Sequence, residues 1–299
     1  MSIETWISKN TTSLHGKTVA VTGTTGGIGK ELCRDLASLG ASLILMDRNQ
    51  PRSMAFRDEL LSSYPSVTVR CLPIELSDIQ SVKAACEELK KDAPDVFIHN
   101  AGAYSIPRHV CDTGFDNVFQ INFVSPYYII RELLPILRQK HGHVEIMGSI
   151  AHRYSKINPN DVDFSKNPRA SRVYGNAKRY LMFSLFELFK NETDVTLSVV
   201  HPGITFTNIT AHYPKLIFAI IKYPMKIIFP KPRRACLSAV LGLFRPTAYH
   251  EWIGPRWFDI WGLPKKKALK SVSIEESEQI GANSEQIYQT IRLNLIANN

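Results

Sequence analysis

Tyr174 and Lys178 stand four residues apart in the segment RVYGNAKRYLMFSLFELF, whose apolar spacing predicts a helix. Residues at i and i+4 share one helix face, so the two side chains are expected to lie together. A lysine ammonium favours a neighbouring phenolate and lowers the pKa of a tyrosine, which is ordinarily about 10. Such a phenol can exchange protons with an alcohol or carbonyl oxygen near neutral pH.

Ser149 follows HVEIM, a short apolar run that reads as a buried strand. The serine is therefore expected at the carboxyl end of a strand, which is the edge where open α/β sheets bind their ligands. Its hydroxyl could hydrogen-bond the same reacting oxygen as Tyr174. The alternative is a serine that only forms a turn.

A glycine-rich stretch separates a predicted strand at 18–22 from a predicted helix. Gly23 permits a tight turn, Gly27 lets the backbone approach a pyrophosphate, and Gly29 allows the helix to pack closely on the sheet. The start of the helix directs its free N–H groups and the positive end of its dipole at the phosphates. The stretch therefore predicts a dinucleotide site.

The second strand is expected to end at Asp47, roughly 20 residues past the glycines. A carboxylate there can hold the ribose hydroxyls of the adenosine and repels the extra phosphate of NADP. Arg48 follows directly and could attract that phosphate, and either charge could instead be a solvated loop residue. The sequence favours NAD and leaves NADP open.

Strands alternate with helices along most of the chain, which predicts a doubly wound parallel sheet of the Rossmann type. We expect one domain over 1–299, with the cofactor-binding and catalytic core at about 17–201 and a last helix, last strand and tail at about 235–299. The strands are expected at 18–22, 42–46, 67–72, 96–99, 143–147, 196–201 and about 249–253.

The composition excludes several other classes of protein. The chain has 299 residues, of which 44% are hydrophobic and 21% charged, as in ordinary globular proteins. The net charge of +9 admits an anionic partner, but no nucleic-acid-binding signature accompanies it. Five cysteines without a C-x-x-C pair, no convergent histidines and no secretory signal predict a reducing, cytoplasmic setting without a metal site.

Taken together, these residues resemble the short-chain dehydrogenase/reductase family from about 17 to 254. Several departures and spacings place the resemblance within its retinol-dehydrogenase-like subgroup, notably Ala151-His152-Arg153 and a long separation between Ser149 and Tyr174. The motifs that carry the resemblance are Thr22-Gly23-x-x-x-Gly27-Ile28-Gly29, Asn100-Ala101-Gly102, Asn122, the set Ser149, Tyr174 and Lys178, and Pro202-Gly203 with Thr207.

The resemblance implies a role for each catalytic residue. Tyr174 would exchange the proton, Lys178 would bind the nicotinamide ribose and lower the phenol pKa, Ser149 would orient the carbonyl, and Asn122 would support a water relay to Lys178. Glu75 stands where an aspartate often contacts adenine. The cofactor contacts that it implies are Gly23, Thr25, Gly26, Gly27, Ile28, Gly29, Asp47, Arg48, Glu75, Leu76, Asn100, Ala101, Gly102, Tyr174, Lys178, Pro202, Gly203, Ile204 and Thr207.

Two departures from the family pattern bear on the cofactor and its surroundings. Gly26 replaces the basic residue of NADP-preferring members, which again favours NAD, and His99 replaces the first asparagine of the family's Asn-Asn-Ala-Gly element. The family also places a substrate lid after Pro-Gly, here at about 204–234. The resemblance implies a homodimer or homotetramer formed through the Tyr174 helix and the helix before it.

The apolar segment at 213–230 has three readings: a lid over an apolar substrate, a peripheral contact with a membrane, or plain packing. The first two favour a hydrophobic small-molecule substrate. The sequence thus predicts an NAD(P)-dependent oxidoreductase that moves a hydride between nicotinamide and an alcohol, ketone or aldehyde of steroid, retinoid or long-chain type. A non-catalytic dinucleotide-sensing protein is the alternative, and an epimerase or dehydratase is disfavoured by the glycine spacing.

Overall fold

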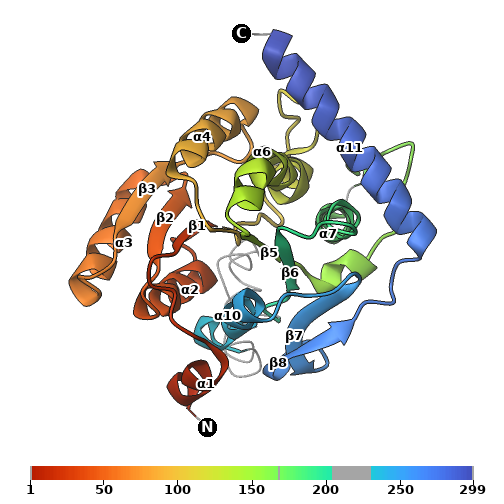
Figure 1. Ribbon diagram of the computed structural model, residues 1–299. Coiled ribbons are helices and arrows are strands. Elements are labelled where there is room, and N and C mark those ends of the chain that lie inside the picture. Colours follow the sequence, from red (N-terminus) through yellow and green to blue (C-terminus); the bar gives the residue numbers. More distant parts are fainter. Residues whose placement is uncertain (1, 168, 204–229, 298–299) are drawn as a thin grey trace, which may run out of the picture.

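Eight strands form one sheet in the order β3-β2-β1-β4-β5-β6-β7-β8 in the computed structural model (Figure 1), which describes residues 2–167, 169–203 and 230–297. Neighbouring strands from β3 to β7 are parallel, and β8 pairs antiparallel with β7 at the edge. The strands are β1 Thr18–Thr22, β2 Ser42–Asp47, β3 Val69–Pro73, β4 Val96–His99, β5 His143–Met147, β6 Thr196–Val200, β7 Glu251–Trp257 and β8 Trp261–Ala268.

Helices cover both faces of this sheet, as the predicted doubly wound fold requires (Figure 1). One face packs on α1 Ile3–Asn10, α2 Gly27–Ser38, α3 Gln50–Ser63 and α10 Leu237–Phe244. The other packs on α4 Ile79–Asp92, α6 Ser125–Gln139, α7 Ala170–Leu188 and α11 Ile274–Ala297. The short elements are α5 Asn117–Phe119, a π-helical turn η1 Gln120–Val124, a 3-10 turn η2 Ile150–Arg153, and α9 Pro232–Ala235.

The predicted parallel strands are confirmed, with small shifts at their ends. The predicted first, fourth and fifth strands coincide with β1, β4 and β5, and each of these three is almost wholly buried. Two elements of the C-terminal region were not predicted. The strand expected near 249–253 is β7, which extends to Trp257 and is followed by a turn and the antiparallel strand β8. The expected tail forms the long helix α11.

The helix α11 lies across α7 and α6 (Figure 1). Polar contacts fix it there: Arg179 pairs with Glu276 at 2.6 Å, and the Tyr288 hydroxyl donates to Glu132 at 2.7 Å. The family resemblance assigned the subunit contact to α6 and α7. In the described residues the chain's own last helix covers this pair, and the oligomeric state itself stays a prediction.

Glu145 is a buried carboxyl group in the middle strand β5. It is fully buried, and neither of its carboxylate oxygens has a hydrogen-bond partner among the described residues. A Cβ atom added to Gly242 of α10 would lie 2.2 Å from Oε2, so the helix packs directly on the carboxyl group. Burial raises the pKa of Glu145 well above its ordinary value, which keeps the group neutral in the folded protein.

We predict that Glu145→Gln removes part of the pH dependence of stability. In the wild type the folded pKa lies above the unfolded one, so unfolding releases a proton and the free energy of unfolding falls as pH rises above about 4.5. The glutamine cannot titrate. Urea unfolding should show the variant gaining stability relative to wild type as the pH rises above about 5. The control is Glu278→Gln, which changes an exposed carboxylate, and parallel curves for wild type and Glu145→Gln contradict the prediction.

Candidate active site

The carboxyl ends of β1 and β4 are joined through the Thr22 hydroxyl. Its oxygen accepts hydrogen bonds from the backbone N–H groups of Asn100 at 3.1 Å and Ala101 at 3.0 Å. The Asn100 amide donates in return to the carbonyl oxygens of Thr22 at 3.0 Å and Gly23 at 2.9 Å. His99, the departure from the family pattern, hydrogen-bonds the same hydroxyl through Nδ1 at 3.1 Å. These bonds hold the glycine turn against the start of the Asn-Ala-Gly element.

Two of the predicted glycines have no room for a side chain. Gly23 has φ +72°, and a Cβ atom there would lie 2.9 Å from Ala101 Cα. A Cβ atom on Gly29 would lie 2.2 Å from the Gly23 carbonyl oxygen. Gly26 caps α2 without a side-chain hydrogen bond, so the first N–H groups of this helix are left to an external acceptor. The turn fits a bound pyrophosphate.

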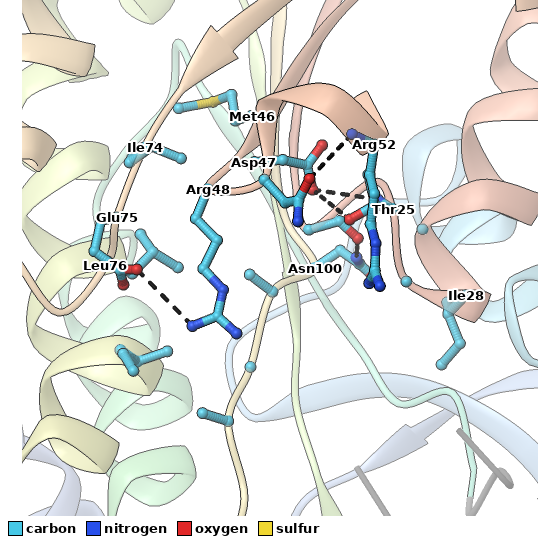
Figure 2. Close-up of a pocket in the computed structure, with 18 of the residues that line it drawn as sticks. Thr25, Ile28, Met46, Asp47, Arg48, Arg52, Ile74, Glu75, Leu76 and Asn100 are labelled. Atoms are coloured by element: carbon cyan, nitrogen blue, oxygen red, sulfur yellow. Dashed lines mark hydrogen bonds and ion pairs between the residues drawn. The ribbon is translucent and has the colours of Figure 1, made fainter. Parts of the chain in front are cut away.

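A pocket of about 410 Å³ opens over this turn (Figure 2). Thirteen residues predicted to contact the cofactor line it, from Gly23 through Asp47, Arg48, Glu75 and Leu76 to Gly102. The sequence did not single out Met46, Asn49, Arg52, Ile74, Ala103, Tyr104, Ile106 and Ile121, which also line it. Several of these directly flank predicted residues at strand ends, which is the signal that could have found them.

Asp47 lies in this pocket, but its carboxylate is held by the protein. Thr24 donates its hydroxyl proton to it, and Thr25 donates through both its backbone N–H and its hydroxyl, each at 3.2 Å. Ser53 of α3 adds a fourth hydrogen bond at 3.2 Å. Asp47 thus fastens the glycine turn and α3 to the end of β2, and most of its acceptor capacity is used there.

Two arginines reach into the same end of the pocket, on either side of Asp47 (Figure 2). Arg48 is exposed and lies 3.9 Å from a carboxylate oxygen of Glu75, which is a loose ion pair. Arg52 comes from the first turn of α3 and is also exposed. Glu75 itself accepts hydrogen bonds from the backbone and hydroxyl of Ser77. This end of the pocket therefore presents two guanidinium groups whose bidentate geometry suits a phosphate.

Tyr174 and Ser149 are brought together by a close approach of α7 to η2. A Cβ atom on Gly175 would lie 2.4 Å from the Ala151 carbonyl oxygen, so only glycine after Tyr174 allows this packing. The side chains of Ser149 and Tyr174 are hydrogen-bonded. The Tyr104 ring lies edge-on to the Tyr174 ring with centroids 5.3 Å apart. Since Tyr104 lines the pocket, the phenol stands beside its inner end.

Lys178 reaches the same place from the next turn of α7. Its ammonium donates to the Met147 carbonyl oxygen at 2.9 Å, at the end of β5, and lies 5.8 Å from the centre of the Tyr174 ring. A Cβ atom on Gly102 would lie 3.8 Å from Nζ and 3.0 Å from Asn122 Oδ1. The structure therefore gathers all four predicted catalytic residues next to the dinucleotide pocket.

The expected lowering of the Tyr174 pKa is wrong for this structure. Burial raises the pKa of Tyr174 to about 12, and the hydrogen bond from Ser149 offsets this only in part. Burial also lowers the pKa of Lys178 to about 7. The sequence argument assumed a charged lysine in polar surroundings, but desolvation disfavours the charged form of both groups and outweighs their spacing on the helix.

Asn122 lies in the π-helical turn η1, and both N–H protons of its side-chain amide are used within the protein. Its two N–H protons go to the carbonyl oxygens of Ala103 and Val118, both at 2.8 Å. Its Oδ1 accepts from the Ala103 backbone N–H at 3.3 Å. Asn122 fixes the peptide at Ala103, and a water relay to Lys178 would use the remaining lone pair of Oδ1.

His152 holds the backbone of Ser149 through a hydrogen bond. It is fully buried, and Nδ1 lies 2.6 Å from the Ser149 carbonyl oxygen while Nε2 lies 2.6 Å from the Ser271 hydroxyl. A carbonyl only accepts, so Nδ1 carries the proton and Nε2 accepts from Ser271. Burial lowers the pKa of His152 to about 4, which keeps the ring neutral. The histidine thereby ties the serine's backbone to the C-terminal region.

Pro202 and Gly203 follow β6 and do not line the pocket described above. Gly203 has φ +84°, and a Cβ atom there would lie 3.1 Å from Pro255 Cγ and 3.2 Å from the Ile260 carbonyl oxygen. Ile204, Thr207 and all of the segment 213–230 except its last residue, with most of the predicted lid, lie outside the described residues.

Fold and pocket together define a class: a doubly wound sheet with a dinucleotide-type site at the carboxyl ends of its strands. A family model described as "short chain dehydrogenase" matches residues 17–160. Mouse retinol dehydrogenase 14 is 30% identical over 281 residues, covering 88% of this chain and 83% of that protein. The chain therefore belongs to the short-chain dehydrogenase/reductase family of oxidoreductases and to its retinol-dehydrogenase-like subgroup.

Solved structures agree with this assignment at the level of the fold. An uncharacterized protein from Mycobacterium paratuberculosis superposes with a TM-score of 0.75 and 20% identity, covering 94% of this chain and 96% of that one. L-sorbose reductase from Gluconobacter frateurii, complexed with NADPH and L-sorbose, gives a TM-score of 0.61 at 17% identity, covering 78% and 91%.

We predict that Lys178→Met stabilises the protein without added dinucleotide, and most strongly at low pH. Because the folded pKa is about 7 and the ordinary value is 10.5, unfolding takes up a proton between these values. Wild-type stability therefore rises with pH across this window, and the cost of the buried charge is largest below about pH 7. Urea unfolding should show a gain of about 2 to 5 kcal/mol at pH 6 that shrinks towards pH 10. An equal gain in the surface variant Lys156→Met, or none in Lys178→Met, contradicts this.

Proposed function

We propose that the protein transfers a hydride between a nicotinamide dinucleotide and an alcohol or carbonyl substrate. The observation that carries this proposal is the meeting of Tyr174, Ser149 and Lys178 at the inner end of the dinucleotide pocket, beside Gly102. A bound nicotinamide would supply or accept the hydride at the substrate carbon.

The chain's own residues would handle the substrate oxygen. Ser149 would donate a hydrogen bond to it and fix its position, and Tyr174 would exchange a proton with it through the phenol oxygen. Lys178 keeps N–H donor capacity after its bond to the Met147 carbonyl, and this would hold the nicotinamide ribose. Asn122 keeps the Ala103 peptide in place beside Lys178.

The protonation of Tyr174 supports reduction as the favoured direction. Burial raises its pKa to about 12, so the phenol keeps its proton at neutral pH. A neutral phenol is the form that can donate to a carbonyl oxygen as the oxygen gains charge, whereas alcohol oxidation needs the phenolate. The proposed activity is therefore carbonyl reduction near neutral pH, with oxidation favoured only at higher pH.

The adenosine end of the pocket supports NADP(H) over NAD(H). The sequence favoured NAD because Asp47 would hold the ribose hydroxyls. That carboxylate instead accepts four hydrogen bonds from Thr24, Thr25 and Ser53, and Arg48 and Arg52 flank it. A 2′-phosphate placed there would meet two guanidinium groups and a carboxylate already turned towards the protein.

The surroundings of Tyr174 support an apolar substrate. Tyr104 and Ile106 line the inner pocket, and Tyr104 packs on the phenol ring. Relatives over most of the chain are named retinol dehydrogenases, which fits an apolar alcohol or aldehyde. We propose one domain, with residues 204–234 as the lid over this substrate and a core at 17–201.

We predict that Tyr174→Phe binds the dinucleotide as wild type does and loses turnover by a factor of about 100 or more, since only the proton carrier is removed. Dinucleotide binding is followed by fluorescence and turnover by nicotinamide absorbance over a panel of ketones and aldehydes. The matched control is Tyr180→Phe on the same helix, whose hydroxyl accepts from Asn283 at 3.2 Å. Unchanged turnover in Tyr174→Phe refutes its role, and tight binding without any wild-type turnover supports the dinucleotide-sensing alternative.

We predict that Arg48→Ala combined with Arg52→Ala raises KM for NADPH about tenfold to a hundredfold and leaves KM for NADH nearly unchanged. Each arginine would contribute a charge-assisted contact to the phosphate that NADH lacks. The control is Arg57→Ala, since Arg57 lies on the same helix and pairs with Asp58 at 2.8 Å. A wild type that prefers NADH, or a variant equally impaired with both cofactors, contradicts the NADP assignment.

A further inference from the structure

The β7–β8 hairpin ends in an unusual turn. Ile260 N–H donates to the Trp257 carbonyl oxygen at 3.0 Å, and the two residues between them, Phe258 and Asp259, have φ values of +54° and +58°. Glycine or asparagine usually occupies such positions, and a bulky phenylalanine there is strained. The positive φ of Asp259 is offset by an ion pair, because its carboxylate lies 2.7 Å from the Lys267 ammonium. Phe258 makes no comparable contact among the residues that the structure describes.

Large apolar side chains gather at this turn and face outward. Phe258 is 85% exposed, which is the highest value among the large apolar side chains of the described residues. Trp257 is 59% exposed, Leu263 45% and Trp261 40%. Single exposed apolar residues are common, but four of them within seven positions of one hairpin form a patch that marks an interaction surface.

Basic residues flank the patch. The hairpin segment 251–268 contains four basic and two acidic residues, in a chain of net charge +9. Asp259 is neutralised by Lys267, and no carboxylate pairs with Arg256 or Lys265 among the residues that the structure describes. Lysines on an edge strand also discourage strand pairing between molecules, but that role does not account for the exposed aromatic rings at the tip.

We propose that this hairpin tip docks the protein on an anionic lipid bilayer. Tryptophan and phenylalanine rings at a protruding turn enter the interface between headgroups and acyl chains, and Arg256 and Lys265 would contact the acidic headgroups. The combination of an apolar tip and a basic rim is complementary to such a surface. None of the described helices has the length and apolarity that crossing a bilayer requires.

The position of the tip adds a consequence for the active site. His201 Nε2 lies 3.1 Å from the Asp259 carbonyl oxygen, and Gly203 packs against Ile260. Arg153, which follows Ser149 in the η2 turn, lies 3.8 Å from Asp259. The tip is therefore at the carboxyl edge of the sheet, beside the catalytic residues. Docking through it turns this edge towards the bilayer, where apolar substrates partition.

Vesicle flotation tests the proposal without substrate or cofactor. The full chain is mixed with vesicles of phosphatidylcholine alone or with added phosphatidylserine. We expect binding to the second kind only, and release by salt. Phe258→Asn should weaken binding about tenfold while preserving the fold, because asparagine suits the positive φ. Arg256→Glu with Lys265→Glu should also weaken it at least tenfold. Leu293→Asn removes a side chain of 65% exposure on α11 and should bind as wild type does.

Three outcomes overturn the proposal. The first is wild-type protein that does not float with phosphatidylserine vesicles. The second is a Phe258→Asn protein that floats as well as wild type. The third is an Arg256→Glu, Lys265→Glu protein that floats as well as wild type. If Phe258→Asn keeps its flotation but lowers kcat/KM for a water-soluble ketone, the tip is instead a wall of the substrate site. Because flotation needs no turnover, it remains informative even if the proposed reaction proves wrong.

Discussion

The Thr22 hydroxyl is the contact on which the site depends most. It accepts two backbone hydrogen bonds from the end of β4 and so sets the distance between the glycine turn and the Asn-Ala-Gly element. Gly23 and Gly29 have no side chains, so at the glycine turn a ligand above the strand ends would contact the protein main chain. The helix N-terminus, the two arginines and the residues proposed to be catalytic are all positioned around this turn.

Burial sets the chemistry that the gathered residues can do. The phenol of Tyr174 and the ammonium of Lys178 are both pushed towards their neutral forms, because little water reaches them. A bound substrate oxygen that gains charge would therefore meet the protonated hydroxyls of Ser149 and Tyr174. Because these groups are already in place, little reorganisation would be needed during the reaction. The same burial disfavours the charged form of Lys178 in the folded protein, so stability is given up here for the proposed reactivity.

The sequence predicted the parallel core because buried strands such as β1 and β5 are short β-branched runs, and their glycine turn and catalytic motifs are local. It did not predict β8, whose sequence WGLPKKKA contains glycine, proline and three lysines, as suits an exposed edge. Nor could local patterns give the pKa of Tyr174 or the engagement of Asp47. Both depend on contacts between segments far apart in the chain, such as Gly175 with Ala151.

The C-terminal helix gives the catalytic segment an internal brace. Arg179 joins Glu276 at the start of α11 to the carbonyl oxygen of His152, and Ser271 bonds the His152 ring that holds the Ser149 backbone. In a protein where a neighbouring subunit supplies such contacts, dilution dissociates the subunits and the contacts are lost. Here the support belongs to the same chain, so its effective concentration is fixed, and these contacts with the Ser149 segment do not depend on how much protein is present.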